Sequence, residues 1–319
     1  MVAKQILFKP LILINWVNLL LAYISLLINY KMFEFFIKVF FKIKFLYDIK
    51  WQMRCKNSEY NLKYFFKIKN KQLRKRLAYQ HIFQLFYNHT QLFDTAYIYL
   101  MGEAGYLSQA RNMRFIAQED IQKIVNQNKK VIFCHSHSNS KIFSIIALTK
   151  QFSVGKTTLY IQKNFNQAIV NLITQASHNE NFEVNTYDSG IGDERAFLSS
   201  IKQHDIIHLF FDPSIFRIQS EYKTCKIKLF DQEGIVISTP AMLSRLIKAP
   251  LVPVFCSGKN IFLSKPIAYD EFQGTKDEKI TQTMQALYDS NMAHIKEFSY
   301  SWDYTHQCEH YFRDTKYEA

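Results

Sequence analysis

The chain has 319 residues, 48% of them apolar, and is therefore long enough to bury a sizeable hydrophobic core. Only 8 glycines and 6 prolines occur, which argues against long linkers, low-complexity segments and extended disorder. The 40 lysines and arginines exceed the 27 aspartates and glutamates by 13, and this excess favours anionic partners such as nucleic acid, anionic lipid or an acidic carrier protein.

The first element is an apolar segment, Pro10–Tyr30, which contains no charged residue. A helix needs about 20 apolar residues to cross a bilayer, so this segment predicts a transmembrane anchor within residues 1–31. A cleaved signal peptide is the alternative, although the segment is long for one and no small-residue cleavage site follows it. More lysines and arginines follow the segment than precede it, which predicts that the rest of the chain lies in the cytoplasm.

Residues 32–57 are expected to form a basic amphipathic helix. The stretch Met32–Tyr47 reads MFEFFIKVFFKIKFLY, in which spaced lysines interrupt phenylalanine and isoleucine. Such a helix lies in the head-group region of a bilayer, where its lysines meet anionic lipid. The alternative is an ordinary helix packed on the following domain, which we expect to occupy residues 58–319.

The remaining chain predicts an α/β fold, with a mixed sheet covered by helices. Residues 58–104 show helical spacing of apolar positions throughout. From Val131 onward, short apolar runs alternate with helical stretches. The expected strands are Val131–Cys134, Thr158–Ile161, Phe182–Thr186, Ile206–Phe211, Lys226–Phe230 and Leu251–Cys256. The expected helices lie near 139–150, 164–178, 192–203, 237–248 and 277–298.

Two histidines follow the run Val131–Cys134, in the sequence VIFCHSHSNS. The carboxyl end of a strand is where α/β folds bring side chains into a crevice. A histidine at that place can act as a general base on a hydroxyl group. His135 and His137 are therefore candidate catalytic residues, and the alternative that they only hydrogen-bond to the backbone stays open.

Asp212 follows a second apolar run, Ile206–Phe211, and is a third candidate catalytic residue. A carboxylate there either caps the next turn or faces the same crevice as His137. His204 and His208 flank the start of this run. We expect both to be structural, because no acidic or cysteine partner lies at metal-ligand spacing from them.

The five cysteines are widely scattered, without a Cys-x-x-Cys pair. This spacing predicts neither a zinc site nor a disulfide framework, and it fits a reducing compartment. We therefore expect no bound metal and no cofactor. Cys134 and Cys256 each end an apolar run, which favours small core residues over reactive thiols.

The most specific stretch runs from Ile227 to Phe255. It predicts a strand, a turn, a helix with Pro240 in its first turn, and a strand entered through Ala249–Pro250. Its segments PAMLSR (240–245) and APLVPVF (249–255) resemble the late acyltransferases of lipid A biosynthesis, within the lysophospholipid acyltransferase superfamily. The resemblance extends in order over nearly the whole chain, from the N-terminal anchor through NLKYFF (61–66), the strand before His137, LYIQKN (159–164) and residues 196–212 to WDYTH (302–306).

The resemblance implies a glycerolphosphate-acyltransferase-like fold and a His-x-x-x-x-Asp/Glu motif. In that motif the histidine deprotonates the acceptor hydroxyl and the acid orients the histidine. The ungapped match places the histidine at His137, and a shift of two residues places it at His135. The acidic position then falls on Ile142 or Ser140, and neither side chain can orient a histidine as a carboxylate does. Three acids farther along the chain remain alternative sources of the carboxylate: Asp188, Asp193 and Asp212.

The resemblance thus implies a single-pass enzyme of the cell inner membrane, with its catalytic domain on the cytoplasmic side. It would move a fatty acyl group from acyl-carrier protein or acyl-CoA to a hydroxyl of a lipid or surface glycolipid, next to an anionic membrane surface. The alternative is a degenerate relative with a lipid-binding or scaffolding role, favoured by the missing acid and by the lack of the family's arginine in residues 171–177. We do not expect a nucleic-acid partner, because the lysines cluster beside the membrane segment and no nucleic-acid-binding motif occurs.

Overall fold

The computed structural model describes residues 30–93, 110–117, 121–128, 130–152, 155–162, 170–171, 173–174, 182–187, 194–212 and 223–312. The expected membrane anchor lies outside these residues, apart from Tyr30 and Lys31, which begin the first described helix. None of the helices in the described part of the chain combines the length and the apolar character needed to cross a bilayer.

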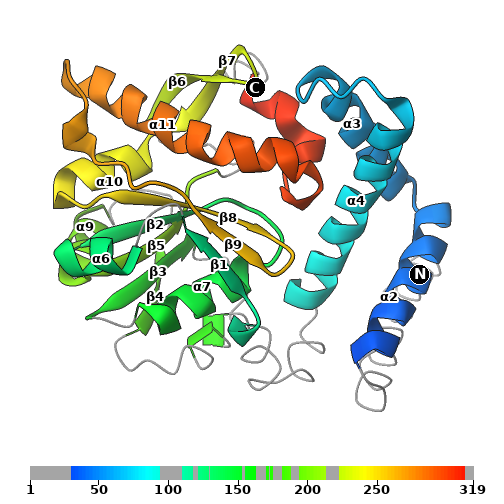
Figure 1. Ribbon diagram of the computed structural model, residues 1–319, viewed down its shortest axis with the longest axis horizontal. Helices are drawn as coiled ribbons and strands as arrows, with labels where there is room; N and C mark the ends of the chain where they lie inside the picture. Colours follow the sequence, from blue (N-terminus) through cyan, green and yellow to red (C-terminus); the bar gives the residue numbers. More distant parts are fainter. Residues whose placement is uncertain are drawn as a thin grey trace, which may run out of the picture.

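The centre of the molecule is a seven-stranded sheet with the strand order β1-β9-β8-β2-β5-β3-β4 (Figure 1). All neighbouring strands are parallel except β8 and β9, which form an antiparallel hairpin. The predicted α/β class with a mixed sheet is therefore confirmed, and the sheet is mostly parallel. The strands are β1 Arg114–Ala117, β2 Val131–His135, β3 Thr157–Gln162, β4 Phe182–Tyr187, β5 Ile206–Phe210, β8 Leu251–Ser257 and β9 Asn260–Leu263.

Helices cover both faces of the sheet, because successive side chains of a strand point to opposite faces and those of β2 are apolar on both. Val131 and Phe133 pack in one core with α6 and α7. Ile132 and Cys134 pack in a second core with α9, α10 and α11. These helices are α6 Ile121–Gln127, α7 Lys141–Gln151, α9 Glu194–Gln203, α10 Thr239–Ile247 and α11 Lys276–Glu297.

A separate antiparallel hairpin consists of β6 Thr224–Leu229 and β7 Gln232–Ile237. The sequence predicted β6 but not β7. The two turn residues, Phe230 and Asp231, have φ values of 47° and 66°, as a two-residue turn of type I′ requires, whereas such turns are usually marked by asparagine and glycine. The usual sequence signal for such a turn is therefore missing here. The side chain of Phe230 is buried, and its ring packs on Phe66 with ring centroids 4.8 Å apart.

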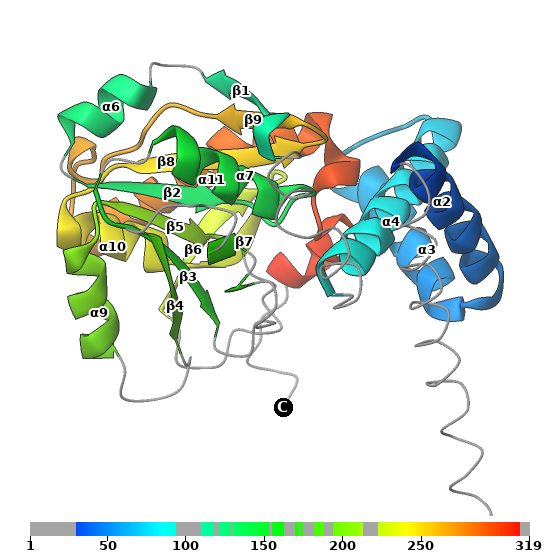
Figure 2. The same ribbon diagram turned by 90° about the horizontal axis from the view of Figure 1, so that it is seen from below.

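Three further helices, α2 Tyr30–Tyr47, α3 Ile49–Tyr64 and α4 Lys71–Phe93, stand to one side of the sheet (Figure 2). The single helix expected over 32–57 is thus divided at Asp48, whose carboxylate accepts a hydrogen bond from the backbone N–H of Lys50 at 3.0 Å and caps α3. α3 continues across the boundary expected at residues 57/58. The continuous helix expected from residue 58 is interrupted before α4, where Lys67 has a φ of 57°.

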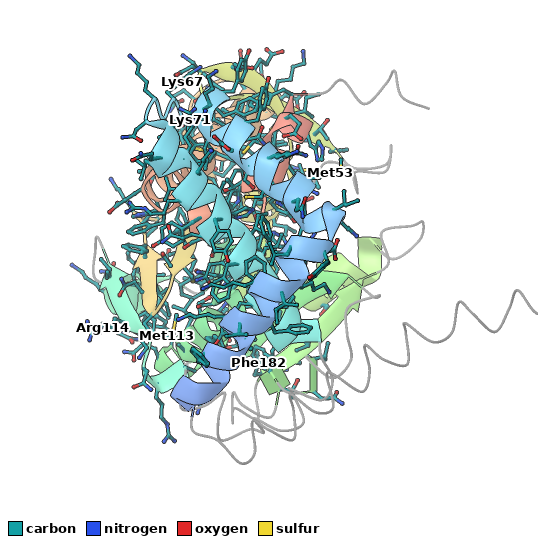
Figure 3. The ribbon with its side chains drawn as sticks, turned by 90° about the vertical axis from the view of Figure 1, so that its right-hand side faces the viewer. Met53, Lys67, Lys71, Met113, Arg114 and Phe182 are labelled. Carbon is teal, nitrogen blue, oxygen red and sulfur yellow. The ribbon has the colours of Figure 1, made fainter. Side chains whose placement is uncertain are left out.

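α2 has two apolar faces. On one face, Ile37 and Phe41 are buried against Trp51 of α3 and Phe86 of α4. On the other, large apolar side chains are exposed, among them Leu46 at 69% and Tyr47 at 84%. The exposed apolar residues of α2 and the start of α3 will be called the outer stripe: Phe35, Ile43, Leu46, Tyr47, Ile49 and Met53. Figure 3 looks onto these helices and shows Met53 projecting from the side of α3.

The segment after α11 lies between the sheet and the helices α3 and α4 (Figure 1). It contains two short 3-10 helices, η3 Ser299–Ser301 and η4 Thr305–Tyr311, and will be called the C-terminal clamp (residues 299–312). The buried amide of Asn61 in α3 donates hydrogen bonds to the backbone oxygen of Thr305 at 3.0 Å and to Glu309 Oε2 at 2.7 Å. The clamp thereby ties the helical group to the sheet.

The packing of α2 yields a stability prediction. We expect Phe41→Ala to lower the free energy of unfolding by about 3–5 kcal/mol, because it opens a cavity among the rings that α2 buries. Ile43→Ala, a change on the exposed face of the same helix, should cost less than about 1 kcal/mol. Urea unfolding of both variants under the same conditions measures the difference, and equal losses would contradict the observed orientation of α2.

Candidate active site

The register of two parallel strands brings His137 and Asp212 together. β2 and β5 pair residue for residue, with Val131 opposite Ile206 and His135 opposite Phe210. Continuing this register by two residues beyond each strand places His137 opposite Asp212. Both side chains lie at the carboxyl edge of the sheet, where the functional sites of α/β folds are usually found.

Asp212 is a buried carboxylate, 1% exposed, that receives N–H groups from two segments. The backbone N–H of His137 lies 2.9 Å from Oδ1 and 3.1 Å from Oδ2. The ring atom Nδ1 of His137 lies 2.8 Å from Oδ1, and the indole Nε1 of Trp302 lies 2.8 Å from Oδ2. These donors compensate for the loss of water around the buried charge. Asp212 therefore contacts His137, as one of the two alternatives for this residue requires.

His137 is held so that one ring nitrogen is bound and the other is available. An ionised carboxylate only accepts hydrogen bonds, so Asp212 fixes the proton of the neutral ring on Nδ1 and leaves the lone pair on Nε2. The ring lies between Phe210 and Tyr304, with centroid distances of 4.6 and 5.2 Å. The side chain is 23% exposed. A partly accessible Nε2 beside a fixed carboxylate can take a proton from a bound hydroxyl group.

The C-terminal clamp closes over this site. The backbone N–H of Asp303 donates to the carbonyl oxygen of His137 at 2.7 Å, and the N–H of Asn139 donates to the oxygen of Ser301 at 2.8 Å. Asp303 also forms an ion pair with Lys141, in the first turn of α7. The loop that carries His137 is therefore held on both sides, by the sheet and by the clamp.

His135 occupies a different environment from His137. It is fully buried, with Nε2 at 2.9 Å from Nδ1 of His208 and Nδ1 at 3.3 Å from the hydroxyl of Ser144. Burial lowers the pKa of His135 well below its usual range, and the nearby His208 and His137 lower it further. His135, although a candidate catalytic residue, thus lies in a buried hydrogen-bonded chain, whereas the side chain of His137 is partly exposed.

His208 and His204 both have structural partners, as expected. His208 continues the buried chain to the hydroxyl of Thr149 at 3.4 Å, and burial lowers its pKa to about 3. His204 is buried and pairs with Glu183, an acid that its sequence spacing does not suggest. In the described ranges of the chain, no group of three or more histidine, cysteine and acidic side chains is arranged to hold a metal ion.

At the position where the family has an acid, this chain has an apolar residue, and its surroundings in the structure are also apolar. Ile142, in the first turn of α7, is buried in the core. Two of the alternative acids, Asp188 and Asp193, lie outside the described residues.

The closing histidine of the resemblance, His306, pairs with His81 of α4. Nδ1 of His306 lies 3.1 Å from Nε2 of His81, and burial lowers the pKa of His306 to about 2. Trp302 also contacts Asp212. The two residues are 90 positions apart in the sequence, and no motif spacing predicts their contact.

Comparison with known proteins identifies one family. The family model described as bacterial lipid A biosynthesis acyltransferase matches residues 3–307, which is nearly the whole chain. No curated protein matches the chain significantly. The match includes both strands that carry His137 and Asp212, and it extends into the C-terminal clamp as far as Gln307.

The buried histidines predict an acid-sensitive fold. In the unfolded chain a histidine binds a proton below pH about 6.5, whereas His208 in the folded chain stays neutral down to about pH 3. Between these values the unfolded state binds more protons, so stability decreases as the pH falls. We expect His208→Asn to reduce the loss of unfolding free energy between pH 7 and pH 5 by about 1–2 kcal/mol.

Urea unfolding at the two pH values measures this loss. Thr149→Val is the matched control, because it removes the hydrogen bond to His208 but leaves the titrating ring in place. The control should lose as much stability on acidification as the wild type. An unchanged pH dependence in His208→Asn would show that this ring does not limit stability in acid.

Proposed function

Because the chain belongs to the family of bacterial lipid A biosynthesis acyltransferases, we propose that it transfers a fatty acyl group from a thioester donor to a hydroxyl group of a lipid or surface glycolipid. Nε2 of His137 removes the proton of the acceptor hydroxyl while the oxygen attacks the thioester carbonyl. The tetrahedral intermediate then expels the donor thiol, which takes up the proton from His137. An ester replaces the thioester, and no redox partner is needed.

One observation carries the assignment of these roles: the hydrogen bond of 2.8 Å between Nδ1 of His137 and the buried carboxylate of Asp212. The family's local acid is replaced by Ile142, yet a carboxylate occupies the place on Nδ1 that orients a catalytic histidine. This contact supports an active enzyme over a degenerate relative. Asp212 acts through His137 and is a positioning residue in the proposed reaction.

The thioester donor is proposed to be an acyl-carrier protein or acyl-CoA, both of which are anionic. The net charge of +13 supports attraction of either donor to the chain. Transfer measured with both donors at increasing salt distinguishes them, because the rate with the physiological donor should be higher and should fall as salt screens the attraction.

We expect His137→Gln and Asp212→Asn each to lower kcat for acyl transfer by about 10²–10⁴-fold, because each removes part of the proton-transfer pair. The assay uses the purified full chain in detergent micelles with a radiolabelled acyl thioester and a lipid acceptor. The double variant should be little slower than either single variant, since the two residues act as one unit.

His135→Gln is the matched control, a histidine only two residues from His137 but buried away from the crevice. Its rate per folded molecule should exceed that of His137→Gln by at least about tenfold. Equal losses in both variants would contradict the assignment of the base. Wild-type binding of the lipid without any transfer would instead favour a lipid-binding or scaffolding protein.

We further propose that the chain acts at the cytoplasmic surface of the inner membrane, held by residues 1–31 and by the outer stripe. The outer stripe offers apolar side chains for the acyl region of a bilayer, as in helices that lie in the membrane interface. Lys42 and Lys50 are exposed on the same two helices and would meet anionic head groups. The catalytic domain, proposed to begin after residue 57, would then lie at the bilayer surface, where the acyl chain and the lipid acceptor can both enter.

This placement predicts contact between Leu46 and lipid. A fluorophore on Leu46→Cys, in the full chain reconstituted into nanodiscs, should be quenched by nitroxide-labelled lipid, because the side chain would lie at the level of the acyl chains. The same fluorophore on Glu271→Cys, an exposed position beside α10, should be quenched much less. Cys55 and Cys225 are replaced by serine in both variants. Equal quenching would favour a helix that only packs on the domain.

A further inference from the structure

Trp302 points its indole N–H at the carboxylate that orients His137. Nε1 of Trp302 lies 2.8 Å from Oδ2 of Asp212, and both side chains are buried. A hydrogen bond to an ionised group is about twice as strong as one between neutral groups, and burial strengthens it further. This hydrogen bond is therefore strong enough to affect the orientation of the carboxylate.

The two carboxylate oxygens of Asp212 share the backbone N–H of His137, and each has one further partner of its own. Oδ1 accepts the ring N–H of His137 at 2.8 Å, whereas Oδ2 accepts the indole N–H at 2.8 Å. The terminal torsion of an aspartate has a broad energy minimum, so the contacts with His137 alone still leave the carboxylate some freedom to turn. A donor fixed on Oδ2 restricts this rotation and keeps Oδ1 in line with the imidazole.

Trp302 is itself held rigidly. Its backbone forms an isolated β-bridge with Ser138, one residue after His137. Its ring stacks on Tyr311 with centroids 5.9 Å apart and meets the ring of Tyr304 edge-on at 6.0 Å. A rigid donor is suited to hold the carboxylate in place, because the side chain of Trp302 does not have to rearrange during the reaction.

We propose that Trp302 is a positioning residue of the reaction, whose indole N–H fixes the carboxylate of Asp212 against His137. The proposal rests on the function proposed above for His137. It assigns a role in catalysis to the C-terminal clamp, in which Trp302 acts on the acceptor hydroxyl through Asp212 and His137.

The kinetic test is Trp302→Phe in the full chain, assayed for acyl transfer in detergent micelles. We expect kcat to fall about 10- to 100-fold, the equivalent of one charge-assisted hydrogen bond. KM should stay within about twofold, because the Trp302 side chain is fully buried. A loss that appears in KM alone, or no loss in the folded variant, would overturn the proposal.

Tyr288→Phe is the matched control. It also converts a buried aromatic residue to phenylalanine and removes one hydrogen bond, from the Tyr288 hydroxyl to the carbonyl oxygen of Phe211 at 3.4 Å, next to Asp212. It leaves the carboxylate contacts intact, so its kcat should exceed that of Trp302→Phe by about tenfold. If Trp302→Phe does not fold, benzothienylalanine at position 302 replaces the N–H by sulfur in a ring of the same shape, with the same expected loss.

A spectroscopic measurement separates this proposal from the proposed function. In the NMR spectrum, the indole N–H proton of Trp302 is identified by its disappearance in Trp302→Phe. We expect Asp212→Asn to move this signal upfield, since the charged acceptor is lost, while Tyr288→Phe leaves it in place. The measurement needs no turnover, so an inactive wild type would refute the acyltransferase proposal alone. An indole signal that Asp212→Asn does not move would refute the role of Trp302.

Discussion

The centre of this molecule depends on the compensation of one buried charge. Asp212 lies at the end of β5 without access to water, and an ionised carboxylate in such a place is stable only if N–H groups surround it. The donors come from His137 after β2 and from Trp302 in the C-terminal clamp. The same contacts that stabilise the charge therefore join two strands and the clamp, and they also set the orientation of the histidine.

The acid in this site is supplied across the sheet and not along the chain. In the motif that the resemblance implies, the histidine and its acid lie five residues apart, so local backbone conformation holds them together. Here the pairing of β2 with β5 and the closure of the clamp do so. The start of α7 instead contributes the buried Ile142 to the core and Lys141 to an ion pair with Asp303.

Sequence analysis predicted the fold where hydrophobic patterns are strong and missed it where they are short or unusual. The buried strand β2 and the capped helix α11 were predicted, because a continuous apolar run and helical periodicity identify them. β7 was missed, since Phe230 and Asp231 form a turn without its usual residues. His137 and Asp212 were each recognised at a strand end, but their contact depends on strand order and register. Neither is encoded in local spacing, which also left His135 and His137 unresolved until burial separated them.

The C-terminal clamp also has a consequence for the order of events during synthesis. Trp302 follows Asp212 by 90 residues, so at roughly 5–20 residues per second the ribosome delivers the indole several seconds after the two strand ends that it joins. Until then the carboxylate has only the donors from His137, and the helices α3 and α4 lack the segment that binds Asn61 and His81. A nascent chain thus has its sheet residues before it has the indole donor that completes the surroundings of Asp212.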